Sequence, residues 1–442
     1  MPEADSPVPR TGLTPTDVSL MVVGIVLGIG VFKTPSLVAS HAGDATVFML
    51  LWVLGGLITV IGSVCYAELG SARPNVGGEY AFLRAAYGPK VAVLFAWARC
   101  SVIQPGAIAA AAFVMGDYTN LLWPLGTYGP GIYALAAIAV FTFINYLGTT
   151  PGKLFQKVVQ VLALLCMVGI IVSGVVAEPA VAHAATPHEH SLSHVGLAMM
   201  FILLTYGGWN EAAYLSGELQ DARHNMARAL VAGVLVVVAF SLAINAAYLH
   251  VLGLDGIRSS NTVAAAMMRV VAGDAGATIV SAVVVLATLT TLNGLIITGS
   301  RSYYALGRDV AVLRSIGTWK AQGSTPANAL ILQGAVSGGL VVLGAATREG
   351  FQAMVDYTAP VFWLFMLLVA LSLYIFRRRE SGSESHYRVP LYPLTPALLA
   401  LSSCWVLWSS LFYAGWGSII GVAVLLIGTP LLLLKGASSP EP

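Results

Sequence analysis

Apolar stretches long enough to cross a bilayer as helices recur along the whole chain, and polar loops separate about twelve of them. Unpaired backbone groups are costly in lipid, so only helices and closed barrels span a membrane. The 442-residue chain is 57% hydrophobic and only 10% charged, whereas soluble domains carry about 25% charged residues. The sequence therefore predicts an all-α integral membrane protein embedded in the lipid bilayer, and we expect no nucleic-acid partner.

Basic residues are distributed unevenly between the loops. If the spans alternate in direction, roughly seventeen of the 22 Lys and Arg lie on one side of the membrane and about three on the other. Because cytoplasmic loops carry the excess of Lys and Arg, we expect both termini in the cytoplasm and a location in the cell (inner) membrane. The residues expected outside are Arg258, Arg269 and Arg348.

The first apolar span, from about Asp17 to Ser40, contains three glycines and Pro35. Glycine weakens a helix and proline interrupts its hydrogen-bond ladder, and irregular backbone in a membrane survives only where it is buried or lines a cavity. We therefore predict a break at Gly28-Ile29-Gly30, whose second half-helix would offer unpaired N–H groups to a carboxylate. A helix-packing face at Gly24 and Gly28 is the alternative. No strand precedes these glycines, which argues against a dinucleotide site.

The sixth span, which begins near Val195, repeats this pattern in Leu204-Thr-Tyr-Gly-Gly-Trp-Asn-Glu211, where Gly207 and Gly208 fall mid-span. Asn210 is a suitable N-cap for a second half-helix, and Glu211 falls in its first turn. Broken spans at positions one and six indicate two inverted halves of five helices each, with substrate held between them.

Longer motifs indicate a family. Tyr66-Ala-Glu-Leu-Gly70 with Gly77-Gly-Glu-Tyr80, Tyr206-Gly-Gly-Trp209, and Ser300-Arg-Ser-Tyr-Tyr-Ala-Leu-Gly-Arg-Asp309 resemble motifs of the amino acid–polyamine–organocation (APC) transporters. The resemblance is to the branch of L-type amino acid exchangers and their bacterial relatives. It implies a LeuT-like fold, in which five-plus-five inverted helices with breaks in helices 1 and 6 precede two C-terminal helices.

The expected order along the chain is a cytoplasmic tail (1–16), a first repeat (17–176), an outer loop (177–194), a second repeat (195–376), a cytoplasmic linker (377–392), two final helices (393–434) and a cytoplasmic tail (435–442). A short amphipathic helix is expected at the inner face from Glu79 to Tyr87, and a short lid-like helix outside from Asn261 to Val271.

The resemblance also implies how an amino acid would bind. N–H groups from Gly30 to Phe32 would hold its carboxylate, and carbonyls near Val26 and at Tyr206 to Gly207 would hold its ammonium, so no charged side chain is needed at that depth. The pocket is mostly apolar, and we therefore predict a neutral, small or aliphatic amino acid. The expected substrate-binding residues are Val26, Gly28, Ile29, Gly30, Val31, Phe32, Ile103, Ala107, Leu204, Thr205, Tyr206, Gly207 and Trp209, with Trp363 as a further candidate.

The sequence leaves the coupling mechanism open between exchange and proton symport. The family usually has Ser where Ile29 stands and an aromatic gate where Leu204 stands, and many members have Lys where alignment places Ala163. Lys33 could meet an acidic substrate group, replace that missing charge or extend into the outer vestibule. Glu211 is a candidate proton carrier or a dipole-complementing residue. The coupling candidates are Glu211, Lys33, Ala163, Thr288 and Thr291.

The remaining features have simpler interpretations. Arg99 on the third span is a functional candidate because of its depth, but the favoured interpretation is an inner-leaflet residue that snorkels or pairs with an acid such as Glu68. The four cysteines fall within predicted spans and are expected to be buried free thiols. Four outer-loop histidines, at positions 183, 188, 190 and 194, are expected in a solvated loop, and no metal site, cofactor or disulfide-linked partner chain is predicted.

Other functions remain as alternatives. A polyamine or cationic amino acid transporter of the same fold would want acids in its pocket, where only Glu211 is found. A sensor that binds an amino acid without moving it is a second alternative. An intramembrane enzyme would need paired catalytic groups at depth, and the spans contain none, so we do not expect an enzyme.

Overall fold

The computed structural model describes residues 13–28, 30–75, 77–148, 153–178, 192–217, 219–310, 313–320, 325–347, 349–379, 387–413 and 415–432. Ile29, Arg348 and the histidines at positions 183, 188 and 190 lie outside the described residues, and so do the tails from 1 to 12 and from 433 to 442.

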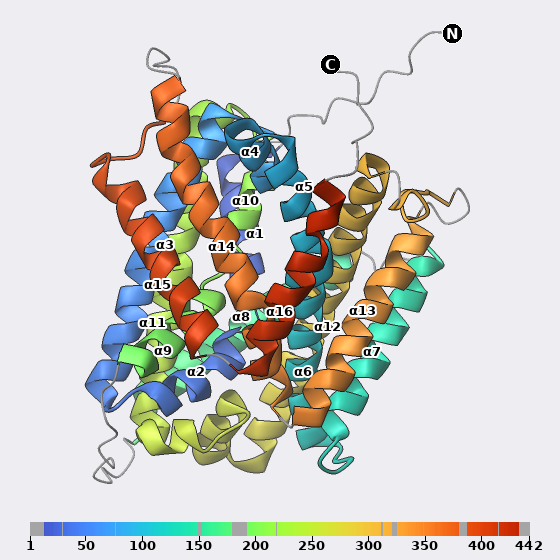
Figure 1. The fold of residues 1–442 in the computed structure, drawn as a ribbon. Helices are drawn as coiled ribbons and strands as arrows, with labels where there is room; N and C mark the ends of the chain where they lie inside the picture. The colour runs from blue at the N-terminus through green and yellow to red at the C-terminus, as the bar shows by residue number, and fades with distance from the viewer. Residues whose placement is uncertain are drawn as a thin grey trace.

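Helices make up a single bundle (Figure 1). Nine helical stretches of the described chain are long and apolar enough to span a membrane, and the bent pair α1 (Pro15–Val26) and α2 (Gly30–His41) forms a tenth. Two shorter apolar helices, α9 (Leu192–Thr205) and α16 (Trp416–Ile427), lie where two further spans of the predicted set of about twelve were expected. The other spans are α3 (Ala45–Ala72), the α5–η1–α6 stretch (Pro89–Leu122), α7 (Gly129–Tyr146), α8 (Lys153–Val176), α11 (Ala222–Arg258), α12 (Val263–Asp309), α13 (Ala327–Thr347), α14 (Gly350–Arg379) and α15 (Leu394–Phe412).

Local capping explains where the first span begins. The Thr14 hydroxyl accepts the Asp17 backbone N–H at 3.2 Å, and the Asp17 carboxylate accepts the Thr14 backbone N–H at 2.9 Å. This reciprocal capping box satisfies two N–H groups that a helix start otherwise leaves unpaired. The helix thus starts at Pro15, two residues before the predicted boundary.

Two short helices outside the bundle confirm predictions from sequence. The amphipathic helix α4 (Gly78–Tyr87) lies across one end of the bundle, at the top of Figure 1; we call this end the α4 end. At the opposite end, α12 bends at Gly273, where φ is 66°, so that its first ten residues form a separate arm. That arm corresponds to the predicted lid-like helix.

Side-chain amides join four helices into one scaffold. Gln104 of α6 donates to the Leu295 carbonyl of α12 at 2.9 Å, and Gln333 of α13 donates to the Ile296 carbonyl at 3.0 Å. Asn145 of α7 donates to the Asn293 side chain at 2.8 Å. Hydrogen bonds of this kind hold helices together in lipid, where the hydrophobic effect does not.

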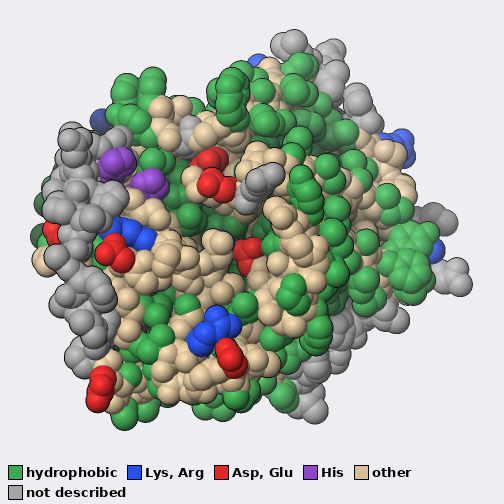
Figure 2. Space-filling view, turned by 90° about the horizontal axis from the view of Figure 1, so that it is seen from below, with side chains coloured by type: hydrophobic (Ala, Val, Ile, Leu, Met, Phe, Trp, Pro, Cys, Tyr) green, Lys and Arg blue, Asp and Glu red, His purple; other side chains and the backbone are tan. Residues whose placement is uncertain are grey.

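The bundle surface is apolar, as the lipid environment requires. Large hydrophobic side chains such as Leu165, Leu401 and Trp416 are exposed along its sides. Figure 2 shows the end opposite α4, where Lys and Arg side chains are sparse. Cys404 of α15 is also exposed and Cys166 is half-buried, so the expectation of four buried thiols is right only for Cys65 and Cys100. Cys166 and Cys404 lie on the apolar sides of the bundle, where a thiol is apolar enough to contact lipid.

Candidate functional site

The predicted break in the first span is present. The α1 helix ends at Val26, α2 starts at Gly30, and the two axes are inclined by 51°. The first N–H groups of α2, from Gly30 to Phe32, belong to its first turn and have no carbonyl partner within the helix. The carbonyl of Val26 is less available than predicted, because it accepts the Gly28 N–H at 2.7 Å.

The sixth span is broken as well. Helix α9 ends at Thr205, and a non-helical segment from Tyr206 to Gly208 leads into the short helices η2 (Trp209–Glu211) and α10 (Ala212–Leu215). Gly208 has φ of 100°, a conformation that glycine adopts at little cost. It is Gly208, and not the predicted Asn210, that precedes the second half-helix, because the Asn210 side chain turns away to Glu79.

The two breaks face each other directly. A Cβ placed on Gly30 would lie 2.9 Å from the Thr205 Cα, and one placed on Gly208 would lie 3.0 Å from the Ile25 Cγ2. The hydroxyls of Thr34 and Thr205 are hydrogen-bonded, and Thr34 also donates to the Gly30 carbonyl at 2.8 Å. The start of one half-helix and the end of another therefore meet at one buried point, where dipole ends of opposite sense lie together.

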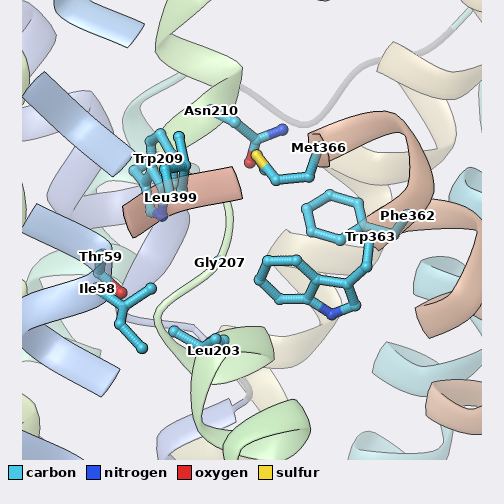
Figure 3. A pocket seen from close by; sticks show the side chains of 10 residues that line it. All are labelled: Ile58, Thr59, Leu203, Gly207, Trp209, Asn210, Phe362, Trp363, Met366 and Leu399. Atoms are coloured by element: carbon cyan, nitrogen blue, oxygen red, sulfur yellow. The ribbon is translucent and has the colours of Figure 1, made fainter. Parts of the chain in front are cut away.

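A small pocket opens beside the sixth-span break (Figure 3). In this Gly207 pocket, Phe362 and Trp363 of α14 lie across from the non-helical backbone at Gly207. Trp209 also lines the pocket, and its ring packs edge-on against Tyr66 with centroids 4.9 Å apart. The complete lining is Ile58, Thr59, Leu203, Gly207, Trp209, Asn210, Phe362, Trp363, Met366 and Leu399.

A second pocket continues from the first towards the α4 end. It shares Asn210, Phe362 and Met366 with the Gly207 pocket and adds Glu79, Phe95, Arg99, Ile103, Glu211 and Phe365. Ile103 thus lies where a pocket residue was predicted. Leu204 is 39% exposed, and its neighbour Leu203 lines the Gly207 pocket. Which of the two leucines faces the pocket depends on how the helices pack together, and residue types alone do not show it. The predicted binding residues that line neither pocket are Val26, Gly28, Gly30, Val31, Phe32, Ala107, Leu204, Thr205 and Tyr206.

Arg99 lies in a π-helical turn, η1 (Arg99–Ile103), that interrupts the third span. Its guanidinium donates to both carboxylate oxygens of Glu211 at 3.0 Å, and it lies 3.8 Å from a carboxylate oxygen of Glu79. The expected pairing with Glu68 is wrong, because Glu68 is held by Arg377 through two contacts of 2.7 Å. The sequence had suggested a proton-carrying or a dipole-complementing role for Glu211, and neither interpretation included a pairing with Arg99.

Of the three interpretations of Lys33, the structure contradicts the extension into an outer vestibule. Its side chain is buried rather than extended into a vestibule, and its ammonium pairs with Asp117 of α6 at 2.7 Å. It also donates to the Asn261 carbonyl at 3.3 Å. The Lys33 charge is therefore paired within the protein, and removing its partner would leave an uncompensated buried charge.

The other coupling candidates are not assembled around one cavity. Ala163 of α8 is buried, and the hydroxyls of Thr288 and Thr291 donate to carbonyls of their own helix, Val284 and Ala287. The α8 residue that lies against the first span is Gln160, whose amide occupies the space where Gly24 would carry a Cβ. Gln160 was missed because helical periodicity does not show which residue of α8 meets α1.

Comparison with known proteins decides the family. The model of the amino acid permease family matches residues 13–430. The chain belongs to this family. Its members are transporters, so the protein is a multi-pass membrane transporter of amino acids rather than an enzyme, and the LeuT-like architecture predicted from the motifs holds.

Three relatives illustrate the range of similar proteins. The chain is 26% identical to the serine/threonine exchanger SteT of Bacillus subtilis over 417 residues, which cover 93% of each chain. It is 29% identical to human b(0,+)-type amino acid transporter 1 over 395 residues, or 87% of this chain and 79% of the relative. It is 27% identical to mouse large neutral amino acids transporter small subunit 2 over 431 residues, or 94% and 79%.

Proposed function

We propose that the protein exchanges neutral amino acids, small or aliphatic ones in particular, across the cell membrane by alternating access. The contact between the two breaks supports this proposal most strongly. Gly30 of α2 and Thr205 of α9 approach so closely that only a glycine fits, and their half-helices end at the same point. A zwitterion suits such a point, because N–H groups attract its carboxylate and carbonyls attract its ammonium.

In this proposal the carboxylate binds at the first turn of α2, from Gly30 to Phe32, and the ammonium binds near Tyr206 and Gly207. The side chain of the amino acid enters the Gly207 pocket, whose aromatic and aliphatic lining favours an uncharged group. The names of two similar proteins, an exchanger of serine and threonine and a transporter of large neutral amino acids, agree with a neutral substrate.

The α4 end faces the cytoplasm in this proposal. The loops and helix ends there carry Arg73, Arg84, Arg223, Arg308 and Arg377, among others, whereas Arg258 and Arg269 lie at the opposite end. The excess of basic residues marks the cytoplasmic side of a membrane protein.

Counterflow in proteoliposomes tests the proposal. Vesicles loaded with one unlabelled amino acid are presented with a panel of radiolabelled neutral, cationic and acidic amino acids, with and without a pH gradient. We expect accumulation of small and aliphatic neutral amino acids by counterflow. Flux confined to polyamines or cationic amino acids would replace the proposed substrate class, and binding of an amino acid without flux would indicate a sensor.

A further inference from the structure

A cluster of charged side chains lies between the Gly207 pocket and the α4 end of the bundle. It consists of Glu79 of α4, Arg99 of η1 and Glu211 of η2, with Tyr66, Asn210 and Tyr214 around them. All three charged residues line the second pocket. Two carboxylates face a single guanidinium, so the cluster carries one excess negative charge when both acids are ionised. Excess charge of that kind is costly away from water.

The Arg99 guanidinium donates its carboxylate hydrogen bonds to Glu211. One nitrogen of Arg99 donates to both oxygens of Glu211 at 3.0 Å, and the other donates to the Tyr214 hydroxyl at 3.1 Å. The Nε of Arg99 is buried and has no hydrogen-bond partner among the described residues. Glu79 lies 3.8 Å from Arg99, so it shares the guanidinium's charge with Glu211 but receives no hydrogen bond from it.

The two oxygens of Glu79 differ in their surroundings. Oε1 accepts short hydrogen bonds from the Tyr66 hydroxyl at 2.7 Å and from Asn210 at 3.1 Å. Oε2 has only the Tyr214 hydroxyl at 3.4 Å and Arg99 at 3.8 Å. Burial raises the pKa of Glu79 above its ordinary value, and nearby Glu211 also raises it, while Arg99 and the hydrogen bonds from Tyr66 and Asn210 act in the opposite direction. The side chains of α5 and α14 at this pocket, Phe95, Phe365 and Met366, carry no charge.

We propose that Glu79 binds one proton at Oε2 while the route from the Gly207 pocket to the α4 end is closed, and releases it when that route opens. The proton comes from water, forms an O–H bond at Oε2, and points towards the Tyr214 hydroxyl. The remaining Arg99–Glu211 pair is then neutral overall. Opening exposes the cluster to water, where an ionised Glu79 is favoured.

The expected pH dependence follows from linkage. The closed state binds one more proton than the open state, so acidity favours the closed state and alkalinity favours the open one. A single proton changes this equilibrium by at most about tenfold per pH unit. The inference rests on the proposed function and orientation, because it assigns the cluster to the cytoplasmic half of the transport route.

Glu79→Gln tests the proposal, because the amide has the shape and neutrality of the protonated acid. With the same pH on both sides of the vesicle, wild-type counterflow should slow as the pH falls, by up to about tenfold per pH unit. E79Q should be slow at every pH and lose this slope. Glu68→Gln is the matched control: Glu68 is equally buried but has Arg377 as its own cation, so E68Q should retain the wild-type slope.

An infrared pH titration of the purified protein provides a readout that does not need transport. We expect the wild type and E68Q to show a component of the protonated carboxylic acid carbonyl band that E79Q lacks. A wild-type pH slope in E79Q, a pH-independent wild type, or an unchanged band in E79Q would overturn the proposal. If the wild type exchanges no amino acid at all, the proposed function fails, and the infrared titration still decides whether Glu79 holds a proton.

Discussion

Gly30 is the residue on which the two breaks depend, because its missing side chain allows α2 to touch α9. We predict that Gly30→Leu abolishes uptake, by more than about tenfold, while the protein is still made and inserted. The added side chain would collide with Thr205, whose Cα lies 2.9 Å and whose Cγ2 lies 3.0 Å from the position of a Cβ. Counterflow and detergent-extracted yield measure the two effects.

The control for this substitution is Gly339→Leu. Gly339 also lies within a helix, α13, but a Cβ there would meet nothing within 4 Å. Uptake by G339L should match the wild type. Equal uptake by G30L and G339L would mean that no substrate binds between the two breaks.

At the scale of single residues, the sequence predicts the structural features that depend on local backbone preference. Glycines at positions 28, 30, 207 and 208 predicted both breaks, since poor helix formers act within their own turn. The partners of Lys33 and Arg99 could not be predicted, because Asp117 and Glu211 lie in other spans and only the folded bundle brings them together. The same reasoning explains why Leu203 rather than Leu204 lines the pocket.

Between elements, a buried ion pair holds the half-helix α2 against α6. Lys33 and Asp117 lie 2.7 Å apart, and the Tyr118 hydroxyl of α6 also donates to the Phe32 carbonyl at 3.1 Å. We predict that Asp117→Asn destabilises the protein by about 3–5 kcal/mol, because it leaves the Lys33 charge buried without a counter-ion. Thermal unfolding in detergent, followed by tryptophan fluorescence, measures the loss.

A double substitution separates this charge effect from simple loss of shape. Lys33→Met with Asp117→Leu removes both charges and keeps most of the volume, so it should recover most of the stability that D117N loses. If the double variant loses as much stability as the two single substitutions combined, the pair stabilises the protein through its shape rather than its charge.

For the whole molecule, hydrophobicity predicted the number of spans, their order and the two short helices at the ends, because lipid imposes a length on every crossing helix. It could not predict the amide contacts among Gln104, Asn145, Asn293 and Gln333, which join helices far apart in the chain. The π-helical turn at Arg99 was not predicted either, although Pro105 just after it is a residue that interrupts a helical hydrogen-bond ladder. That turn carries the guanidinium that pairs with Glu211.

Orientation in the membrane is a property of the whole chain, and two exposed arginines at opposite ends test it. Arg84 lies on α4, and Arg269 lies on the arm before Gly273. In a Cys404→Ser background, which removes the exposed native thiol, we predict that a membrane-impermeant maleimide labels R269C in intact cells and labels R84C only after lysis. The charge bias between the loops is the physical reason. The opposite labelling pattern would invert the topology and place the Glu79–Arg99–Glu211 cluster on the outer route, while the fold and the meeting of the two breaks would stand unchanged.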